Sequence, residues 1–480
     1  MSGAVIHWFR RDLRLGDNLA LHEAIKSGAP VIPVFVFDPA ILKSERSGAP
    51  RMALLLKALD ALDGELRGYG KGLLVRTGDP LDVLPSLVAE SRAQAVFLNR
   101  DYSPFAVRRD NALAERLPIP VHAFDDAMLM PPSHIVKSDG RPYTVYTPYK
   151  NNWRKQQKPS ISTLELNSSH FHNLTGLNGQ DLPTLAELGF KSSVETPQVG
   201  EAAALQKLDA FVAQDIFTYR EDRNRLPIDP FAAERPVGSS FLSPYFRLGM
   251  LSPRQAYWAA REAYERAPNE TSRESVSTWV DELIWREFYM QILANFPHVN
   301  TDNFRPEYNA LDWRHAPEEL QAWQEGQTGY PIVDAAMRQM NTVGWMPNRA
   351  RMIVASFLCK DLLIHWKEGE RYFMQRLFDG DPAANNGGWQ WAAGTGTDAQ
   401  PYFRIFNPVS QSQKFDPDGT YIRHFVPELQ AVSAKFIHAP WEMDSPPKGY
   451  PAPMVDHSAA RERTLAAFKA VKAGEAEAHY

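Results

Sequence analysis

Residues 4–9, AVIHWF, begin a series of short apolar runs that sets the architecture of the first part of the chain. Four more runs follow, namely VIPVFVF at 31–37, LLVR at 73–76, AVFLN at 95–99 and VHAF at 121–124. Runs of this length are typical of strands buried on both faces. Between them, residues 51–67 and 105–116 carry apolar residues at helical spacing. Because alternating strands and helices form right-handed βαβ units, we predict an open, mainly parallel five-stranded sheet with flanking helices.

The chain then changes character twice. Residues 131–199 are rich in Pro, Ser and Asn and carry few long apolar patterns, which favours a long connection along the surface. From residue 200 onward, helical periodicity replaces the strand-like runs. We therefore predict an α/β domain at 1–130, an interdomain linker at 131–199 and an all-α domain at 200–475.

The composition limits the possible classes of function. A hydrophobic fraction of 44% and a charged fraction of 23% are typical of a soluble globular protein. Cys359 is the only cysteine, which excludes an internal disulfide and leaves too few thiols for a structural zinc site. The net charge of −5 argues against a surface that binds nucleic acid everywhere, but it allows a local basic face. No apolar stretch is long enough to span a membrane, so we expect a cytoplasmic protein.

The segment 377–408, LFDGDPAANNGGWQWAAGTGTDAQPYFRIFNP, concentrates polar, small and aromatic residues. Asp and Asn can hydrogen-bond to the edge of a heteroaromatic ring, Gly permits close approach of the backbone, and Trp offers a surface for stacking. The segment therefore favours a site for a flat cofactor with polar edges. The alternative is a Gly-rich turn that covers an aromatic cluster.

Two further segments suggest chemistry less strongly. Residues 238–254, GSSFLSPYFRLGMLSPR, place Ser and Gly before a helical pattern, as in an anion site for a diphosphate or in an ordinary helix cap. In 278–293, TWVDELIWREFYMQIL, Glu282 lies between Trp279 and Trp285 at helical spacing. The alternative for this second segment is a core helix in which Glu282 pairs with a nearby Arg. No GxGxxG fingerprint and no Walker loop occurs.

Five motifs in the same order resemble the photolyase and cryptochrome family, and most closely the microbial class I cyclobutane pyrimidine dimer photolyases. They are HWFRRDLRLGDN at 7–18, DELIWREFY at 281–289, TGYPIVDAAMRQMNTVGWMPNRARMIVASFL at 328–358, GDPAANNGGWQWAAGTGTDAQPYFRIFNP at 380–408 and YPAPMVDH at 450–457. The resemblance implies an N-terminal α/β domain, a linker and a helical domain that binds FAD in a folded conformation. It also implies that the second domain repairs DNA.

The resemblance implies which residues bind FAD. The matching positions are Tyr219, Ser239, Ser240, Leu242, Ser243, Trp279, Glu282, Arg286, Asn348, Arg351, Asp379, Asp381 and Asn385. Asn385 matches an amide beside flavin N5 that can accept its proton in the reduced ring. Arg351 and Asp379 match a charge pair whose positive field favours the anionic reduced flavin.

Three tryptophans, Trp389, Trp366 and Trp313, match the family's electron-transfer chain from flavin to surface. The dimer pocket is matched by Glu282, Trp285, Met352 and Trp391, with Asn348 and Gln411 at DNA-contact positions. Two indoles can sandwich a flipped-out dimer, and an acidic donor can stabilise the charge on its radical anion. The resemblance thus makes Glu282 and Asn385 the catalytic residues, and no metal is implied.

The chain departs from the family pattern at three places. Pro347 in GWMPNR replaces the usual His, which argues against 6-4 photolyase activity. Residues 225–238, RLPIDPFAAERPVG, are longer than in many relatives. Phe105 and Ala106 replace the Asn and Glu that hold a folate antenna, whereas other residues match positions used for a deazaflavin, namely Asp38, Arg51, Asp101 and Arg247. The expected second chromophore is therefore a deazaflavin of the 8-HDF type or methenyltetrahydrofolate.

Together these features predict light-dependent repair of cyclobutane pyrimidine dimers by electron transfer from reduced FAD, FADH⁻. The expected partner is damaged DNA, with no membrane and no obligatory protein partner, and the protein is expected to be a monomer in the bacterial cytosol and nucleoid. One alternative is a cryptochrome, which has the same fold and cofactor but no repair activity. Another is a flavin oxidoreductase, which would need a nicotinamide site that the sequence does not show.

Overall fold

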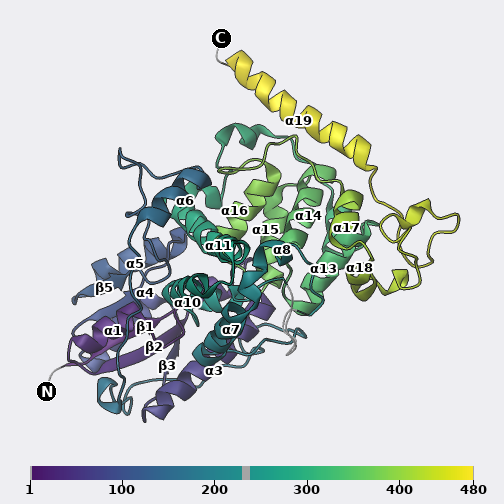
Figure 1. Cartoon of the computed structure of the whole chain (residues 1–480). Coiled ribbons are helices and arrows are strands. Elements are labelled where there is room, and N and C mark those ends of the chain that lie inside the picture. Colours follow the sequence, from purple (N-terminus) through teal and green to yellow (C-terminus); the bar gives the residue numbers. More distant parts are fainter. Residues whose placement is uncertain (1–2, 230–237, 479–480) are drawn as a thin grey trace. The chain divides into compact units, whose positions relative to one another are not determined.

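A computed structural model describes residues 3–229 and 238–478, so the predicted long stretch 225–238 lies in part outside the described residues. The contacts divide the chain into two compact units (Figure 1). The sheet unit comprises Met1–Ser192, Thr196–Phe217 and Leu242–Pro297. The helical unit comprises Ser193–Glu195, Thr218–Phe241 and His298–Tyr480. The domain boundaries predicted from the sequence stay a prediction, since the units combine separate stretches of chain.

The sheet unit is built on a five-stranded, fully parallel sheet, which confirms the fold class predicted from the apolar runs. The strand order is β3-β2-β1-β4-β5. The strands are β1 (Val5–Phe9), β2 (Val31–Phe37), β3 (Leu74–Thr77), β4 (Val96–Asn99) and β5 (Val121–Phe124). All residues of β1 and β2 are buried, as expected for central strands covered on both faces.

Crossover helices connect the strands and begin at polar capping residues. The side chains of Asn18, Asp79 and Ser103 accept bonds from the first-turn N–H groups of α1 (Leu19–Lys26), α4 (Pro80–Ser91) and α5 (Pro104–Arg116). Leucines of α4 and α5 pack with the strands in one apolar core. The predicted helix at 51–67 is present as α3 (Ala49–Gly68).

The order of the strands reverses between β1 and β4, because the chain builds β2 and β3 on one side of β1 and β5 on the far side of β4. In open parallel sheets, ligands bind beyond the carboxyl ends of the strands at such a switch point. Residues 10–12 and 99–101 lie there and line a small cavity.

The remaining elements of the sheet unit are helical. They are α2 (Pro39–Leu42), α6 (Tyr146–Lys155), η1 (Ser168–His170), α7 (Glu201–Ala213), η2 (Asp215–Phe217), α9 (Ser243–Leu248), α10 (Pro253–Arg266) and α11 (Glu270–Asn295). The linker prediction missed α6, whose buried residues Tyr146, Tyr149 and Trp153 form a short aromatic stripe. Only ten residues long, this helix depends on packing against α11 rather than on a long periodic pattern.

The helical unit contains no strand among its described residues. Its elements are α8 (Tyr219–Asp222), η3 (Pro297–Asn300), η4 (Pro306–Ala310), α12 (Pro317–Glu325), α13 (Pro331–Val343), α14 (Asn348–Ser356), η5 (Phe357–Asp361), α15 (Trp366–Arg376), α16 (Pro382–Ala393), α17 (Pro408–Phe415), α18 (Thr420–Phe425), η6 (Pro427–Leu429), η7 (Pro440–Glu442) and α19 (His457–Ala478). One apolar core joins α13, α14, η5, α15, α16 and α18. Within the residues described, no helix has the length and apolarity needed to cross a membrane.

Candidate functional site

Arg351 and Asp379, two of the predicted cofactor residues, form an ion pair in the helical unit. Arg351, on α14, donates from Nη2 to both carboxylate oxygens of Asp379, at 3.1 and 2.8 Å. Its Nε donates to the carbonyl of Met346 at 2.8 Å, which fixes the plane of the guanidinium. The Asp379 side chain is 5% exposed and that of Arg351 is 25% exposed, so the pair presents its cationic side to the more open surroundings. The predicted contact is therefore present, and its role at a flavin stays a prediction.

The central part of the polar segment 377–408 forms helix α16, and the Gly-containing stretch 394–407 that follows is turn and irregular structure. Asp381 is its N-cap and accepts bonds from the N–H groups of Ala383 and Ala384 at 2.9 and 3.2 Å. This capping offsets the poor helix propensity of the two Asn and two Gly residues that follow. Asp381 thus has a structural role as the N-cap of α16, and its predicted contact with the cofactor stays a prediction.

The two asparagines of α16 are used differently. Asn386 is buried and donates to the carbonyl of Val299 at 2.8 Å. Asn385 is only partly buried, and its Nδ2 donates to the carbonyl of Glu370 at 2.9 Å. That bond leaves the amide oxygen as the group that Asn385 can present to a ligand. An acceptor at this position fits a flavin whose N5 carries a proton, so the residues present fit FAD.

The three predicted relay tryptophans all lie in the helical unit. Trp389 is 2% exposed and makes an edge-to-face contact with Phe373 at a centroid distance of 4.9 Å. Trp366 is fully buried, and its indole N–H donates to Asn303 Oδ1 at 2.8 Å. Trp313 is only partly buried. The order of burial therefore agrees with a path that ends toward solvent.

The predicted phosphate segment begins in the helical unit at Ser239 and Ser240, both partly buried. Phe241, which follows them, is buried with a φ of +52° and packs on Trp345 at a centroid distance of 4.7 Å. A non-glycine residue in this region is strained, and such strain is concentrated at functional segments. The ring of Trp345 lies 6.0 Å from the guanidinium of Arg351, so the segment ends near the ion pair. Tyr219, also predicted here, is buried at the start of α8.

In the sheet unit, α11 carries the predicted residues of the DELIWREFY motif. Trp279 is buried against Phe211, and Arg286 donates to the carbonyl of Ala127 at 2.7 Å. Trp285 stacks face to face on Tyr146 of α6 at 3.5 Å, with 6° between the ring planes. One face of this indole is therefore covered, and Phe288 and Tyr289 also contact the indole, at centroid distances of 5.6 and 5.5 Å. Glu282 is partly buried on the same helix. Leu242 and Ser243 begin the six-residue helix α9.

Glu287 is a buried residue of the same motif that the sequence analysis did not identify. Its carboxylate accepts bonds from the Trp153 indole at 2.7 Å and from the N–H of Met130 at 3.2 Å. Burial raises the pKa of Glu287, while these donors oppose the rise. Through these hydrogen bonds Glu287 connects α11 to α6 and to the loop that follows β5.

The predicted dimer and DNA residues of the helical unit lie on α14, α16 and α17. Asn348 is exposed and its Nδ2 lies 3.8 Å from the sulfur of Met352, one turn further along α14. Trp391 is partly buried on α16, which packs against α14. Pro347, which replaces the family's His, is the N-cap of α14 and offers no side-chain donor. Gln411 lies on α17, and its buried Oε1 has no hydrogen-bond partner within the described residues.

The four predicted antenna residues are all in the sheet unit, and Arg11 contacts two of them. Arg11 donates to the Asp101 carboxylate at 3.2 Å and to the Arg247 carbonyl at 3.4 Å. Burial opposes ionisation of Asp101, yet the charge of Arg11 holds its pKa well below the usual range. Asp38 instead caps α2 and lies 3.6 Å from Arg109, and Arg51 donates to the carbonyl of Arg46 at 2.6 Å.

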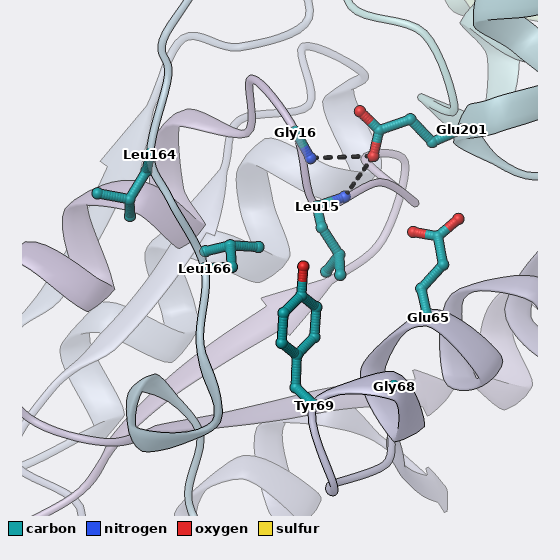
Figure 2. A pocket seen from close by; sticks show the side chains of 8 residues that line it. All are labelled: Leu15, Gly16, Glu65, Gly68, Tyr69, Leu164, Leu166 and Glu201. Atoms are coloured by element: carbon teal, nitrogen blue, oxygen red, sulfur yellow. Dashed lines mark hydrogen bonds between the residues drawn. The ribbon is translucent and has the colours of Figure 1, made fainter.

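A separate pocket of about 590 Å³ in the sheet unit contains none of the predicted residues (Figure 2). It is lined by Leu15, Gly16, Glu65, Gly68, Tyr69, Leu164, Leu166 and Glu201. Glu201 accepts bonds from the N–H groups of Leu15 and Gly16, each at 2.9 Å, and the Glu65 carboxylate faces the same space. Burial and the charge of Glu201 raise the pKa of Glu65 to about 7.

Comparisons with known proteins agree with the arrangement of both units. Residues 5–166 match the family described as DNA photolyase, and residues 279–470 match the FAD binding domain of DNA photolyase. The deoxyribodipyrimidine photo-lyase of a Synechococcus species is 40% identical over 99% of this chain and 99% of its own length. A bacterial class III photolyase structure from Agrobacterium tumefaciens superposes with a TM-score of 0.88 at 37% identity, covering 98% of both chains.

A cryptochrome structure from Synechocystis superposes almost as well, with a TM-score of 0.85 at 30% identity over 96% of this chain and 98% of its own. The fold is thus shared by repair enzymes and by cryptochromes, and it does not distinguish between them. Both domain families match, and full-length photo-lyases are about 40% identical. The chain therefore belongs to the DNA photolyase family.

Proposed function

We propose that this chain repairs cyclobutane pyrimidine dimers in DNA, driven by light, with FAD as its cofactor. The observation that carries the proposal is the amide of Asn385, whose nitrogen is bonded to the Glu370 carbonyl so that its oxygen is left as an acceptor. A neutral acceptor beside N5 suits the reduced flavin, whereas an Asp in its place would titrate. Identity of about 40% with photo-lyases over the whole chain supports the same activity.

The residues of the helical unit hold the cofactor in the state that donates an electron. Bound FAD supplies, in its photoexcited reduced form, the electron that opens the cyclobutane ring. The guanidinium of Arg351 favours negative charge on the nearby ring, and Asp379 holds the guanidinium in place. The amide oxygen of Asn385 would accept a hydrogen bond from flavin N5–H and so favour the protonated N5. Trp389 offers an indole that could return an electron to an oxidised flavin.

The substrate role falls to residues on α11, α14, α16 and α17. Trp285, stacked on Tyr146 on one side, contacts a flipped-out dimer, and Glu282 hydrogen-bonds to the polar edge of the dimer. A carboxyl group there stabilises the negative charge that develops when the dimer accepts an electron. Met352 and Trp391 contact the apolar surface of the dimer, while Asn348 and Gln411 contact the flanking DNA.

The antenna, partners and location belong to the same proposal. A deazaflavin or methenyltetrahydrofolate absorbs light for the flavin. The contacts of Arg11 with Asp101 and Arg247 support a role for these two residues in binding it. The protein works as a cytoplasmic monomer on damaged DNA without an obligatory protein partner.

The decisive experiment is an absorption spectrum of the purified protein followed by illumination with dimer-containing oligothymidylate under reducing conditions. We expect a non-covalently bound FAD spectrum and light-dependent recovery of thymine absorbance, with no recovery in the dark. A protein that binds FAD but does not restore thymine on illumination would instead be a cryptochrome. A protein that neither carries nor binds FAD would contradict the proposal altogether.

A further inference from the structure

His365 lies between two of the tryptophans of the proposed relay. Its ring centroid is 5.5 Å from that of Trp366 and 5.1 Å from that of Trp313. Both distances are in the range of direct contact between aromatic rings. The imidazole therefore contacts both the buried indole and the partly exposed one.

The backbone fixes this arrangement. Leu363, two residues before His365, is buried with a φ of +52° in the turn that ends η5. The N–H of Arg314 donates to the Leu363 carbonyl at 2.8 Å, so the residue after Trp313 is bonded to the turn that carries His365. The Arg314 guanidinium also donates to the Leu362 carbonyl at 2.9 Å. A strained turn held by several bonds is typical of a segment whose position serves function.

The imidazole is held neutral and in one orientation. Its Nδ1 accepts the N–H of Lys367 at 3.1 Å as the N-cap of α15, which places the ring proton on Nε2. Burial, helped by the charge of Lys367, lowers the pKa of His365 to about 4. A neutral ring adds no repulsion to a positive charge on either indole, whereas an imidazolium would.

The surroundings of Trp366 favour outward movement of a positive charge. Lys367 Nζ lies 5.8 Å from the centre of the Trp366 ring. A cation there makes loss of an electron from Trp366 less favourable than loss from an indole farther from the cation. A positive charge on Trp366 is therefore destabilised, and His365 is a ring in contact with Trp366 that also contacts the next indole, Trp313.

We propose that His365 is the bridge through which electrons pass from Trp313 to Trp366 when the flavin is photoreduced. The inference rests on the proposed function, because it requires the relay of Trp389, Trp366 and Trp313. Trp389 gives one electron to the photoexcited oxidised flavin, Trp366 refills Trp389, and Trp313 refills Trp366. An external thiol reductant then returns one electron to Trp313. Electron transfer through packed aromatic rings is faster than across a gap of the same width, since the coupling falls steeply with empty distance.

Two substitutions separate a bridge from a helix cap. His365→Asn keeps a side chain that can cap α15 but removes the ring, and His365→Phe keeps a ring but removes the cap. Flash photolysis of protein with oxidised FAD should show that His365→Asn slows the transfer from Trp313 to Trp366 several-fold and lowers the yield of stable photoreduction. In His365→Phe the rate of transfer from Trp313 to Trp366 should stay close to that of the unchanged protein. Thermal melting of both variants reports the loss of the cap independently.

The matched control is His424→Asn on α18. His424 is an exposed histidine outside the relay, and its ring centroid lies 4.7 Å from that of Phe425. This variant should leave electron transfer unchanged. In a Trp313→Phe background, His365→Asn should add nothing further, because the outer step no longer exists. Repair by chemically reduced enzyme should be the same in the single His365 and His424 variants, since it does not use the relay.

The outcomes distinguish failure of the bridge from failure of the function beneath it. If Trp389→Phe abolishes photoreduction while His365→Asn leaves every step unchanged, electrons bypass His365 and the inference is wrong. A slow step in His365→Phe with a normal one in His365→Asn would make His365 a cap only. If Trp389→Phe itself has no effect on photoreduction, the relay of the proposed function fails.

Discussion

The indole of Trp389 is the single side chain on which the proposed relay depends most. It is buried among aromatic rings of the helical unit, next to Phe373. We expect Trp389→Phe to block photoreduction of oxidised flavin, because phenylalanine is much harder to oxidise than indole. Repair should remain largely intact once the flavin is reduced chemically. Both activities are measured on one preparation, and an equal loss of both would make Trp389 a structural or substrate-binding residue.

Glu282 is proposed to stabilise the negative charge on the dimer during repair. Glu282→Gln keeps the shape of the side chain, so folding and FAD content should change little. If the carboxyl group stabilises the charged dimer, the quantum yield of repair should fall several-fold. Affinity for damaged DNA should change by less than the roughly 1–3 kcal/mol of an unsatisfied buried group, since the amide still forms hydrogen bonds. An unchanged yield with weaker binding would leave Glu282 as a recognition residue only.

At the scale of the elements, the close approach of α15 to α16 requires a glycine. A Cβ at Gly369 would lie 2.0 Å from the Trp389 ring, a distance that no side chain tolerates. We expect Gly369→Ala to lower the free energy of unfolding by about 1–3 kcal/mol and to reduce the yield of photoreduction, because Trp389 must move.

Gly388 on α16 provides the matched control for this substitution. It is exposed, and apart from its two chain neighbours and the adjacent backbone of its own helix, no described atom lies within 4 Å of an added Cβ. Gly388→Ala should raise the stability by roughly 0.5–1 kcal/mol through helix propensity alone. Urea unfolding of both variants checks the pair, and a Gly369→Ala protein as stable as Gly388→Ala would contradict the packing argument.

The pocket lined by Glu65 and Glu201 in the sheet unit predicts a dependence of stability on pH. The pKa of Glu65 rises from 4.5 to about 7 on folding, so between these pH values the folded state binds more protons than the unfolded state. Stability attributable to Glu65 is therefore present at pH 4 and lost as the pH rises to 7. Glu65→Gln should stabilise the protein at pH 8 by about 1–2 kcal/mol after allowance for solvent screening, and by nothing at pH 4.

This test compares urea unfolding of Glu65→Gln with unfolding of a control, Glu115→Gln, at both pH values. Glu115 is exposed on α5 and far from the pocket in sequence and in its contacts. If the Glu65 variant shows the same stability difference at pH 4 and pH 8, the carboxyl group does not titrate in this window.

For the whole molecule, DNA binding must overcome a net charge of −5. We expect binding that prefers dimer-containing DNA and weakens as salt rises, because lysine and arginine side chains on a local face displace counterions from phosphates. Titration of damaged and undamaged oligonucleotides at several salt concentrations measures both effects. Affinity that ignored both the lesion and the salt would exclude specific recognition of damaged DNA.

The sequence by itself determined the existence and direction of the five strands, since each is a short run of apolar residues and the intervening helices force parallel pairing. It also identified Arg351 and Asp379 as a pair, because the motifs that contain them are specific. The missed helix α6 shows the limit of such patterns. Its three buried aromatic residues are too few to form a long periodic pattern, and the helix packs against α11, which is distant in sequence.

Only the tertiary structure decided which partners the chosen residues meet. Four features join residues that are not neighbours in sequence: the order β3-β2-β1-β4-β5, the Glu370 carbonyl that orients Asn385, the stacking of Tyr146 on Trp285 and the contact of His365 with Trp313. Local patterns record burial and helix propensity, which depend on adjacent residues. Hydrogen-bond partners and ring contacts depend on how distant elements pack, and no local pattern specifies them.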